Sequence, residues 1–240
     1  MTRNLLHPAV LKRLRSLNDA FLAGKISQDD YADQVQRLDT DEGRQEAVAD
    51  RVREVLEDWR LHVVETIGKR NDPSIFDPGR LKAPATHRRV IEHFLNSDRG
   101  VFLHGLSGAG KTWTALLAAQ ALLAKHPGIE CRAISCTDLR ERLLDLSKRP
   151  DDKREFIENL GCSEVLLIDD AFHGISESFV ESFRRILDHH EGRIIITCNW
   201  SIAELGKRTR GTAIARGMAT LLRRIEDSCD SFSFIEEITF

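Results

Sequence analysis

Apolar residues recur at every third or fourth position along most of the first 69 residues, which is the period of an amphipathic helix. One face of the last such segment carries five of them: Val48, Val52, Val55, Trp59 and Val63. The pattern is interrupted at AGKISQDD, where Ser27 can cap a helix that begins at Gln28. We therefore expect two or three helices between residues 5 and 69, in a small helical domain over residues 1–70. Such a domain can pack on itself or on the rest of the chain, or it can dock a partner.

The pattern changes after Ala85, where short apolar runs alternate with helical periods. The apolar runs are GVFLHG, IECRAISC, EVLLIDD and RIIITCN, at residues 100–105, 129–136, 164–170 and 193–199. The helical segments include residues 86–97, 111–125, 137–147, which Thr137 would open, and 176–192. Strands that are apolar along their whole length, and that helices separate, indicate a parallel sheet covered on both faces. Residues 85–240 are thus predicted to form a doubly wound α/β domain.

The segment between these two parts has neither period. GKRNDPSIFDPGRLKAP contains three prolines and two glycines. Prolines and glycines interrupt regular structure, so residues 71–84 are predicted to form a linker.

The composition is typical of a globular protein and limits the sites that the chain can hold. The 240 residues are 41% hydrophobic and 30% charged, with a net charge of −3, so a basic surface for DNA would have to be local. No apolar run approaches the ~20 residues of a transmembrane helix, and the first residues lack the core of a signal peptide. We therefore expect a cytoplasmic protein without a membrane partner. The five cysteines form no Cys-x-x-Cys pair, which argues against a zinc site.

A glycine-rich turn lies between a predicted strand and a predicted helix. It fits the pattern G-x-x-x-x-G-K-[ST] of a phosphate-binding loop from Gly105 to Thr112. In such a loop the backbone amides surround a phosphate at a helix N-terminus, Lys111 adds a positive charge, and the Thr112 hydroxyl is a ligand of Mg²⁺. The alternative is a structural turn with an exposed lysine. We expect a nucleoside triphosphate to be bound here by Gly105, Leu106, Ser107, Gly108, Ala109, Gly110, Lys111, Thr112 and Trp113.

Two acidic residues follow the most apolar strand. Asp169 and Asp170 end the segment VLLIDD, at the sheet edge where open α/β sheets bind ligands. We expect Asp169 to hold a hydrated Mg²⁺ and Asp170 to orient the attacking water. The alternative is a pair of aspartates that cap a turn or helix. Asp170 is one methylene shorter than the glutamate often found at such a position, so its side chain reaches less far.

Asn199 ends the next apolar strand. Its side chain can bind the γ-phosphate or the attacking water, or it can be an ordinary turn residue. Ser201 and Glu204 already form a capping box for the helix that follows, which frees Asn199 for the site.

Two arginines occur late in the chain, in MATLLRRIEDSC. On a helix, Arg223 and Arg224 would point away from the apolar face. They are either solvated side chains or an arginine finger, which inserts into the γ-phosphate site of a neighbouring subunit.

Together these segments resemble an AAA+ ATPase of the group that contains the DnaC/DnaI helicase loaders and the IstB transposition ATPases. The matching segments are GVFLHGLSGAGKTW (Walker A), VLLIDDAF (Walker B), IIITCNWSIAEL (sensor 1), and LLRRIEDSCDSFSF (the arginine-finger helix and last strand). The resemblance implies a P-loop NTPase domain without a full C-terminal lid, with ATP and Mg²⁺ as cofactors. It places the finger at Arg224, with Arg223 as the reserve. It does not cover residues 1–80.

The resemblance also implies an activity and partners. Loaders of this group dock onto the replicative helicase through a small N-terminal helical domain. We therefore expect an ATP-driven switch that self-associates, with Arg224 acting in trans, and that loads a replicative helicase on single-stranded DNA. Hydrolysis would depend on Asp170 and Asn199.

By their positions in the sequence, two loops correspond to those with which this family contacts single-stranded DNA. One contains His173, and the other is SKRPDDKREF, with Lys148, Arg149, Lys153 and Arg154. The interspersed aspartates favour a plain solvated loop for the second.

Three other functions stay open. A transposition regulator of the IstB or TnsC kind would use the same ATPase with a transposase as partner. A small-molecule kinase would fit GLSGAGKT, which also resembles the loop of adenylylsulfate kinase, but it would not explain the adjacent Asp169 and Asp170. A nucleotide-binding adaptor that does not hydrolyse ATP would fit the short Asp170.

Overall fold

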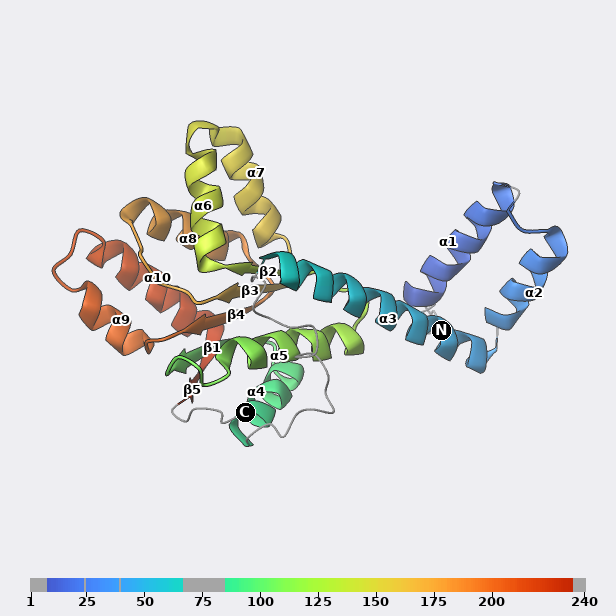
Figure 1. The fold of residues 1–240 in the computed structure, drawn as a ribbon, viewed down its shortest axis with the longest axis horizontal. Helices are drawn as coiled ribbons and strands as arrows, with labels where there is room; N and C mark the ends of the chain where they lie inside the picture. The colour runs from blue at the N-terminus through green and yellow to red at the C-terminus, as the bar shows by residue number, and fades with distance from the viewer. Residues whose placement is uncertain (1–7, 24, 39, 67–84, 235–240) are drawn as a thin grey trace, which may run out of the picture. The chain divides into compact units, whose positions relative to one another are not determined.

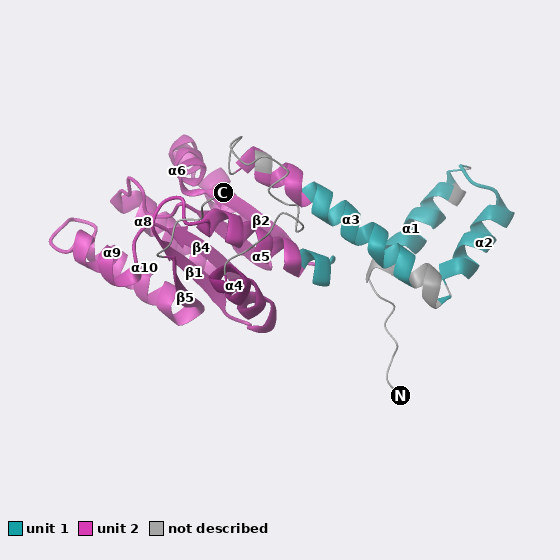
Figure 2. Ribbon diagram, turned by 60° about the horizontal axis from the view of Figure 1, so that its bottom comes forward, with its two compact units in different colours: residues 1–58, 123–128 teal, residues 59–122, 129–240 magenta. Residues whose placement is uncertain are grey.

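A computed structural model describes residues 8–23, 25–38, 40–66 and 85–234, and the chain divides into two compact units (Figure 2). Unit 1 comprises residues 1–58 and 123–128, and unit 2 comprises residues 59–122 and 129–240. The predicted linker, residues 71–84, lies outside the described residues.

Unit 1 is built from helices, as the period of its apolar residues predicts. They are α1 (Pro8–Leu22), α2 (Gln28–Leu38) and the greater part of α3 (Asp41–Thr66). The hydroxyl of Ser27 accepts a hydrogen bond of 3.1 Å from the amide of Asp30, so it caps α2 as expected. Leu17, Leu38 and Ala47 form a small buried core, one from each helix.

The last turns of α3 belong to unit 2. Trp59 and Val63 are buried there, at 3% and 0% exposure. His62 lies between them in sequence, and its Nε2 accepts a 3.0 Å hydrogen bond from the amide of Ala133. Burial lowers the pKa of His62, because a neutral ring suits an apolar surrounding. Two of the five residues of the predicted apolar face, Trp59 and Val63, are thus buried in unit 2.

The core of unit 2 is a five-stranded sheet. Its strands are β1 (Gly100–Gly105), β2 (Cys131–Ser135), β3 (Val165–Asp169), β4 (Arg193–Cys198) and β5 (Cys229–Phe234). They lie in the order β2-β3-β4-β1-β5, and every neighbouring pair is parallel. Parallel pairing requires a crossover between successive strands, which the helices supply.

Helices cover both faces of this sheet (Figure 1). They are α4 (Ala85–Asn96), α5 (Lys111–Lys125), α6 (Cys136–Asp145), α7 (Pro150–Gly161), α8 (Glu177–His189), α9 (Ile202–Thr209) and α10 (Ala215–Ser228), with a short 3-10 turn at Leu146–Lys148. Alternate strand residues such as Leu166 and Ile168 join one apolar core with side chains of α6 to α10. Helices α4 and α5 lie on the other face. The prediction of a doubly wound α/β domain is confirmed.

Two local predictions in unit 2 were wrong. The charged segment expected to be a solvated loop contains α7, which begins with Pro150 in its first turn and buries Ile157 and Leu160. Its arginines pair with the interspersed acids, as Arg149 does with Asp152 at 3.1 Å. The helix that Thr137 was expected to open begins one residue earlier, because Ser135 is its cap.

Among the helices that the structure describes, none is long and apolar enough to cross a membrane.

Candidate functional site

Three neighbouring strands bring the predicted site residues to one edge of the sheet. β1 ends at Gly105, β3 ends at Asp169, and Asn199 directly follows β4. Since β4 lies between β1 and β3 and all three run parallel, these ends meet at the carboxyl edge. The phosphate-binding loop, the acidic pair and the polar residue after β4 therefore face a common space.

The glycines of the loop have backbone angles that only glycine adopts readily. Gly105, Gly108 and Gly110 have φ of 134°, 81° and 79°. A Cβ added at Gly105 would lie 1.8 Å from the carbonyl oxygen of Phe234 in β5, so the two backbones touch. The amide of Leu106 also donates a 3.1 Å hydrogen bond to that oxygen. The loop is thus fixed against β5 before it turns into α5.

Lys111, the first residue of α5, points back over the loop. Its Nζ donates to the carbonyl oxygens of Gly105 and Leu106, at 3.0 and 2.6 Å, and to Oδ1 of Asn199 at 3.0 Å. The residue is only 7% exposed, and burial lowers the pKa of its ammonium, while the nearby carboxylates of Asp170 and Asp169 act to raise it. The ammonium is therefore held at the point where a bound phosphate would need a cation.

Asp169 is a buried carboxylate, 8% exposed. The Thr197 hydroxyl donates to its Oδ1 at 2.7 Å, and its side chain is also hydrogen-bonded to Thr112. Burial raises the pKa of Asp169, and the two hydrogen bonds only partly counter this. The nearby ammonium of Lys111 acts in the same direction as these bonds, yet the pKa stays raised, so a further cation would favour the ionised form.

The oxygens of Thr112 and Asp169 fit Mg²⁺, which prefers oxygen ligands and is commonly bound by one or two protein groups together with phosphates and waters. Within the part of the chain that the structure describes, no cluster of three or more His, Cys, Asp or Glu residues could hold a metal by itself. A metal bound here would thus depend on the nucleotide for further ligands. The roles of Thr112 and Asp169 as ligands stay predictions.

Thr197 was not predicted as a site residue. Its hydroxyl donates to Asp169 and accepts a 2.8 Å hydrogen bond from the amide of Asp170. The sequence could have indicated this role, because Thr197 is the single hydroxyl residue in the apolar strand RIIITC. A hydroxyl that is 1% exposed needs a partner, and the neighbouring strand provides one.

Asp170, His173 and Asn199 form a second group beside Lys111. The amide nitrogen of Asn199 lies 3.1 Å from Nε2 of His173 and donates a long hydrogen bond of 3.5 Å to Oδ1 of Asp170. Asp170 and Phe172 have φ of 51° and 73°, which are uncommon for residues other than glycine. The Asp170 side chain is 57% exposed, so it can reach a bound water.

Helix α4 contributes a histidine next to the loop. His87 is 3% exposed, and its Nδ1 lies 2.5 Å from the hydroxyl of Thr114 in α5. Its ring packs edge-on against Trp113 and Phe234, with centroids 5.8 and 5.0 Å away. Burial lowers the pKa of His87. Trp113, predicted to bind nucleotide, is thus packed on one side by α4.

Arg224 does not lie with the other predicted residues. It is on α10 shortly before Cys229, which pairs with Gly100 at the start of β1, so it lies toward the amino edge of the sheet. Its Nε is 3.8 Å from Oδ1 of Asp188, and its side chain is 47% exposed. Arg224 can therefore serve a γ-phosphate site only in another subunit, and its role as a finger stays a prediction.

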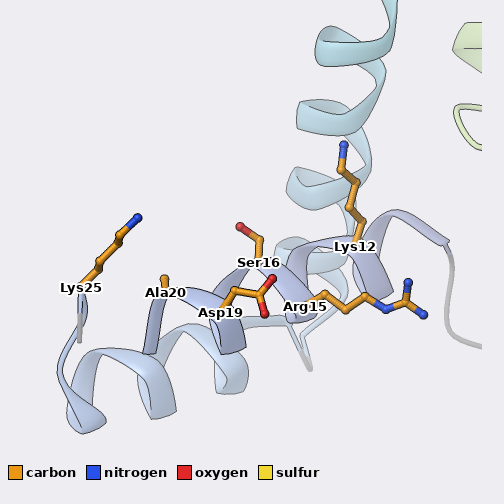
Figure 3. A pocket seen from close by; sticks show the side chains of 6 residues that line it. All are labelled: Lys12, Arg15, Ser16, Asp19, Ala20 and Lys25. Carbon is orange, nitrogen blue, oxygen red and sulfur yellow. The ribbon is translucent and has the colours of Figure 1, made fainter. Parts of the chain in front are cut away.

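Unit 1 carries a separate hollow of about 410 Å³ along one face of α1 (Figure 3). It is lined by Lys12, Arg15, Ser16, Asp19, Ala20 and Lys25. Lys25 stands at one end, with Lys12 and Arg15 at the other. Lys12 is paired with Glu54 at 2.6 Å, so the basic character of the hollow comes from Arg15 and Lys25 beside the single acid Asp19.

Comparison with solved structures shows which fold this is. The structure is similar to that of DnaI, with a TM-score of 0.55 and 20% identity over 68% of this chain and 94% of DnaI. It is also similar to the DnaC helicase loader, with a TM-score of 0.53 and 21% identity over 65% of this chain and 94% of that protein. AMPPCP-bound DnaA from Aquifex aeolicus gives a TM-score of 0.52 and 19% identity over 68% of this chain and 50% of DnaA. No protein-family model matches the sequence, and no curated protein does. The chain has a DnaC/DnaI-like AAA+ fold.

Proposed function

We propose that this protein is an ATP-driven switch that loads a replicative helicase on single-stranded DNA. The observation that carries the proposal is the meeting of Lys111, Asp169, Asp170 and Asn199 at the carboxyl edge of three adjacent strands, in a fold similar to those of DnaI and the DnaC helicase loader. These are the groups that phosphoryl transfer from a nucleotide to water requires.

Each group has a separate task in this proposal. When bound, ATP and Mg²⁺ supply the phosphoryl group and the charge that stabilises it. The loop amides and Lys111 bind the phosphates, while Thr112 and Asp169 hold the metal. Asp170 orients the attacking water, and Asn199 binds the water or the γ-phosphate. Arg224 completes the site of a neighbouring subunit, so hydrolysis depends on self-association.

Unit 1 is the proposed docking part. Its helices carry the basic hollow on α1, and a partner with an acidic surface would complement Arg15 and Lys25. If the protein is a helicase loader, that partner is the replicative helicase. In a transposition regulator it would be a transposase, which the same binding experiment would identify.

The first test is ATP turnover by the full chain, measured with and without single-stranded DNA and at rising protein concentration. Turnover per subunit should rise with concentration, because Arg224 acts in trans. Asp170→Asn should abolish it, and Asp98→Asn, at an exposed aspartate just before β1, is the matched control. Absence of turnover under every condition would leave a nucleotide-binding adaptor.

The second test is co-purification with the full chain as bait. Arg15→Glu, in the hollow of unit 1, should release the partner, whereas Arg37→Glu, on the exposed end of α2, should not. Recovery of a replicative helicase supports the loader. Recovery of a transposase contradicts the proposal that the partner is a helicase. A partner that Arg15→Glu does not release contradicts the proposal that it binds at the hollow.

A further inference from the structure

His173 lies in the loop after β3, and its ring contacts two residues of the site. Its Nε2 is 3.1 Å from Nδ2 of Asn199 and 3.5 Å from Oδ1 of Asp170. Asp170 directly follows β3 and Asn199 directly follows β4, so the ring links the segments after two neighbouring strands.

The direction of the hydrogen bonds fixes the Asn199 side chain. The ammonium of Lys111 can only donate, so the oxygen of Asn199 must face it. The nitrogen of Asn199 then faces His173, and since an amide nitrogen only donates, Nε2 of His173 must accept. The ring is therefore neutral, with its proton on Nδ1.

Several contacts hold His173 in place. Its ring packs on Trp200, with centroids 5.0 Å apart, and the guanidinium of Arg208 covers Trp200 at 4.5 Å. Its backbone amide donates to the buried thiol of Cys136, at the start of α6. One residue further on, the carbonyl of Gly174 accepts a 3.2 Å hydrogen bond from Arg140. The loop is thus attached to two helices, α6 and α9.

We propose that His173 is a positioning residue, which holds the Asn199 carboxamide with its oxygen toward Lys111 and its nitrogen toward Asp170. This inference rests on the proposed hydrolysis of ATP. Without an acceptor at Nε2, the carboxamide can rotate and present its nitrogen to Lys111, which would leave both groups as donors.

The charged and titratable groups around the ring are few. Asp170 faces it directly, Cys136 lies under its backbone, and Arg208 is separated from it by Trp200. Lys111 lies beyond Asn199, and Arg140 reaches the neighbouring Gly174. Of these groups, only the ring bonds the Asn199 nitrogen at ordinary hydrogen-bond length.

Steady-state ATP hydrolysis by full-length variants tests this role. His173→Ala should lower kcat about 10- to 100-fold, as a displaced catalytic group does, with KM for ATP changed less than about threefold. His173→Gln keeps an acceptor oxygen and should recover kcat to within about fivefold of wild type. His126→Ala, at an exposed histidine outside the site, is the control.

Unchanged kcat in His173→Ala, or a His173→Gln variant as impaired as His173→Ala, would overturn the inference. If the wild type does not hydrolyse ATP, the proposed function fails. The orientation of the Asn199 carboxamide is then tested directly by NMR. The side-chain amide signals of Asn199, assigned with Asn199→Ala, should be displaced in His173→Ala and stay close to their wild-type positions in His173→Gln. Equal displacement in the two variants would overturn it.

Discussion

Nζ of Lys111, at the start of α5, donates a hydrogen bond of 3.0 Å to Oδ1 of Asn199, which directly follows β4. With the bonds to the carbonyls of Gly105 and Leu106, all three ammonium protons of Lys111 have acceptors. A phosphate that binds Lys111 therefore has to replace at least one of these acceptors.

Replacing Lys111 should cost nucleotide affinity. Lys111→Ala removes a charge-assisted hydrogen bond to phosphate, so we expect the dissociation constant for ATP to rise about 10- to 100-fold, as measured by calorimetric titration. Lys148→Ala should bind like the wild type. Equal affinities of Lys111→Ala and the wild type would mean that the glycine-rich loop is structural.

Asp169→Asn should separate stability from function. Burial raises the pKa of Asp169, so the folded protein disfavours the ionised form that the unfolded chain adopts freely. Stability is therefore lost as the pH rises through this pKa, and the neutral amide avoids the loss while its oxygen still accepts from Thr197. At pH 7.5 we expect an equal or higher unfolding midpoint without nucleotide and hydrolysis at least about 100-fold slower. A midpoint several degrees lower would contradict this reading.

Arg224→Ala should lower hydrolysis about 10³-fold at high protein concentration, where subunits associate, and should have little effect in dilute protein. Asp188→Ala removes two exposed ion pairs, with Arg224 and with Arg184, and should lower stability by about 1 kcal/mol without lowering activity. Arg223→Ala is the control. A greater loss in Arg223→Ala than in Arg224→Ala would move the finger to Arg223.

Two glycines with positive φ offer a matched test of the contact between the loop and β5. Gly211→Ala meets open space, so only its φ of 78° is unfavourable, at about 1–2 kcal/mol. Gly105→Ala adds an overlap with the Phe234 carbonyl and should destabilise the protein at least twice as much. Urea unfolding of both variants measures the difference. Equal losses would mean that β5 can move away from the loop.

Acid should destabilise the fold through its buried histidines. Burial lowers the pKa of His62, His87 and His104, so the unfolded chain binds protons near pH 6.5 that the folded protein does not. Stability is present above that pH and is lost below it, by up to about 1.4 kcal/mol per pH unit for each histidine. We expect a lower urea midpoint at pH 5.5 than at pH 7.5.

His62→Gln keeps an acceptor for the amide of Ala133 but cannot be protonated. It should therefore reduce this pH dependence, while His126→Gln, at an exposed position, should leave it unchanged. A pH dependence that is the same in both variants would show that His62 does not contribute.

The sequence was most informative where one segment determines its own structure. GLSGAGKT dictates a loop between a strand and a helix, and Ser201 with Glu204 forms the predicted capping box. Whole-length apolar strands such as VLLID likewise predicted the parallel sheet. In each case the signal lies within about ten neighbouring residues.

Other features depend on contacts between distant segments. The bond between Thr197 and Asp169, and the position of His173 between Asn199 and Trp200, follow from strand order and register, which no local pattern contains. The helix at Pro150–Gly161 was missed for a different reason. Its charges suggested a loop, although Pro150, Asp151 and Asp152 are residues favoured in a first helical turn.

The hydroxyl of Thr197 couples the positions of Asp169 and Asp170. One oxygen atom binds both the side chain of Asp169 and the backbone of Asp170, so a shift of β4 against β3 changes both positions together. The residue that would hold the metal and the residue that would orient the water cannot be adjusted one at a time. Their geometry is assembled or lost in a single step.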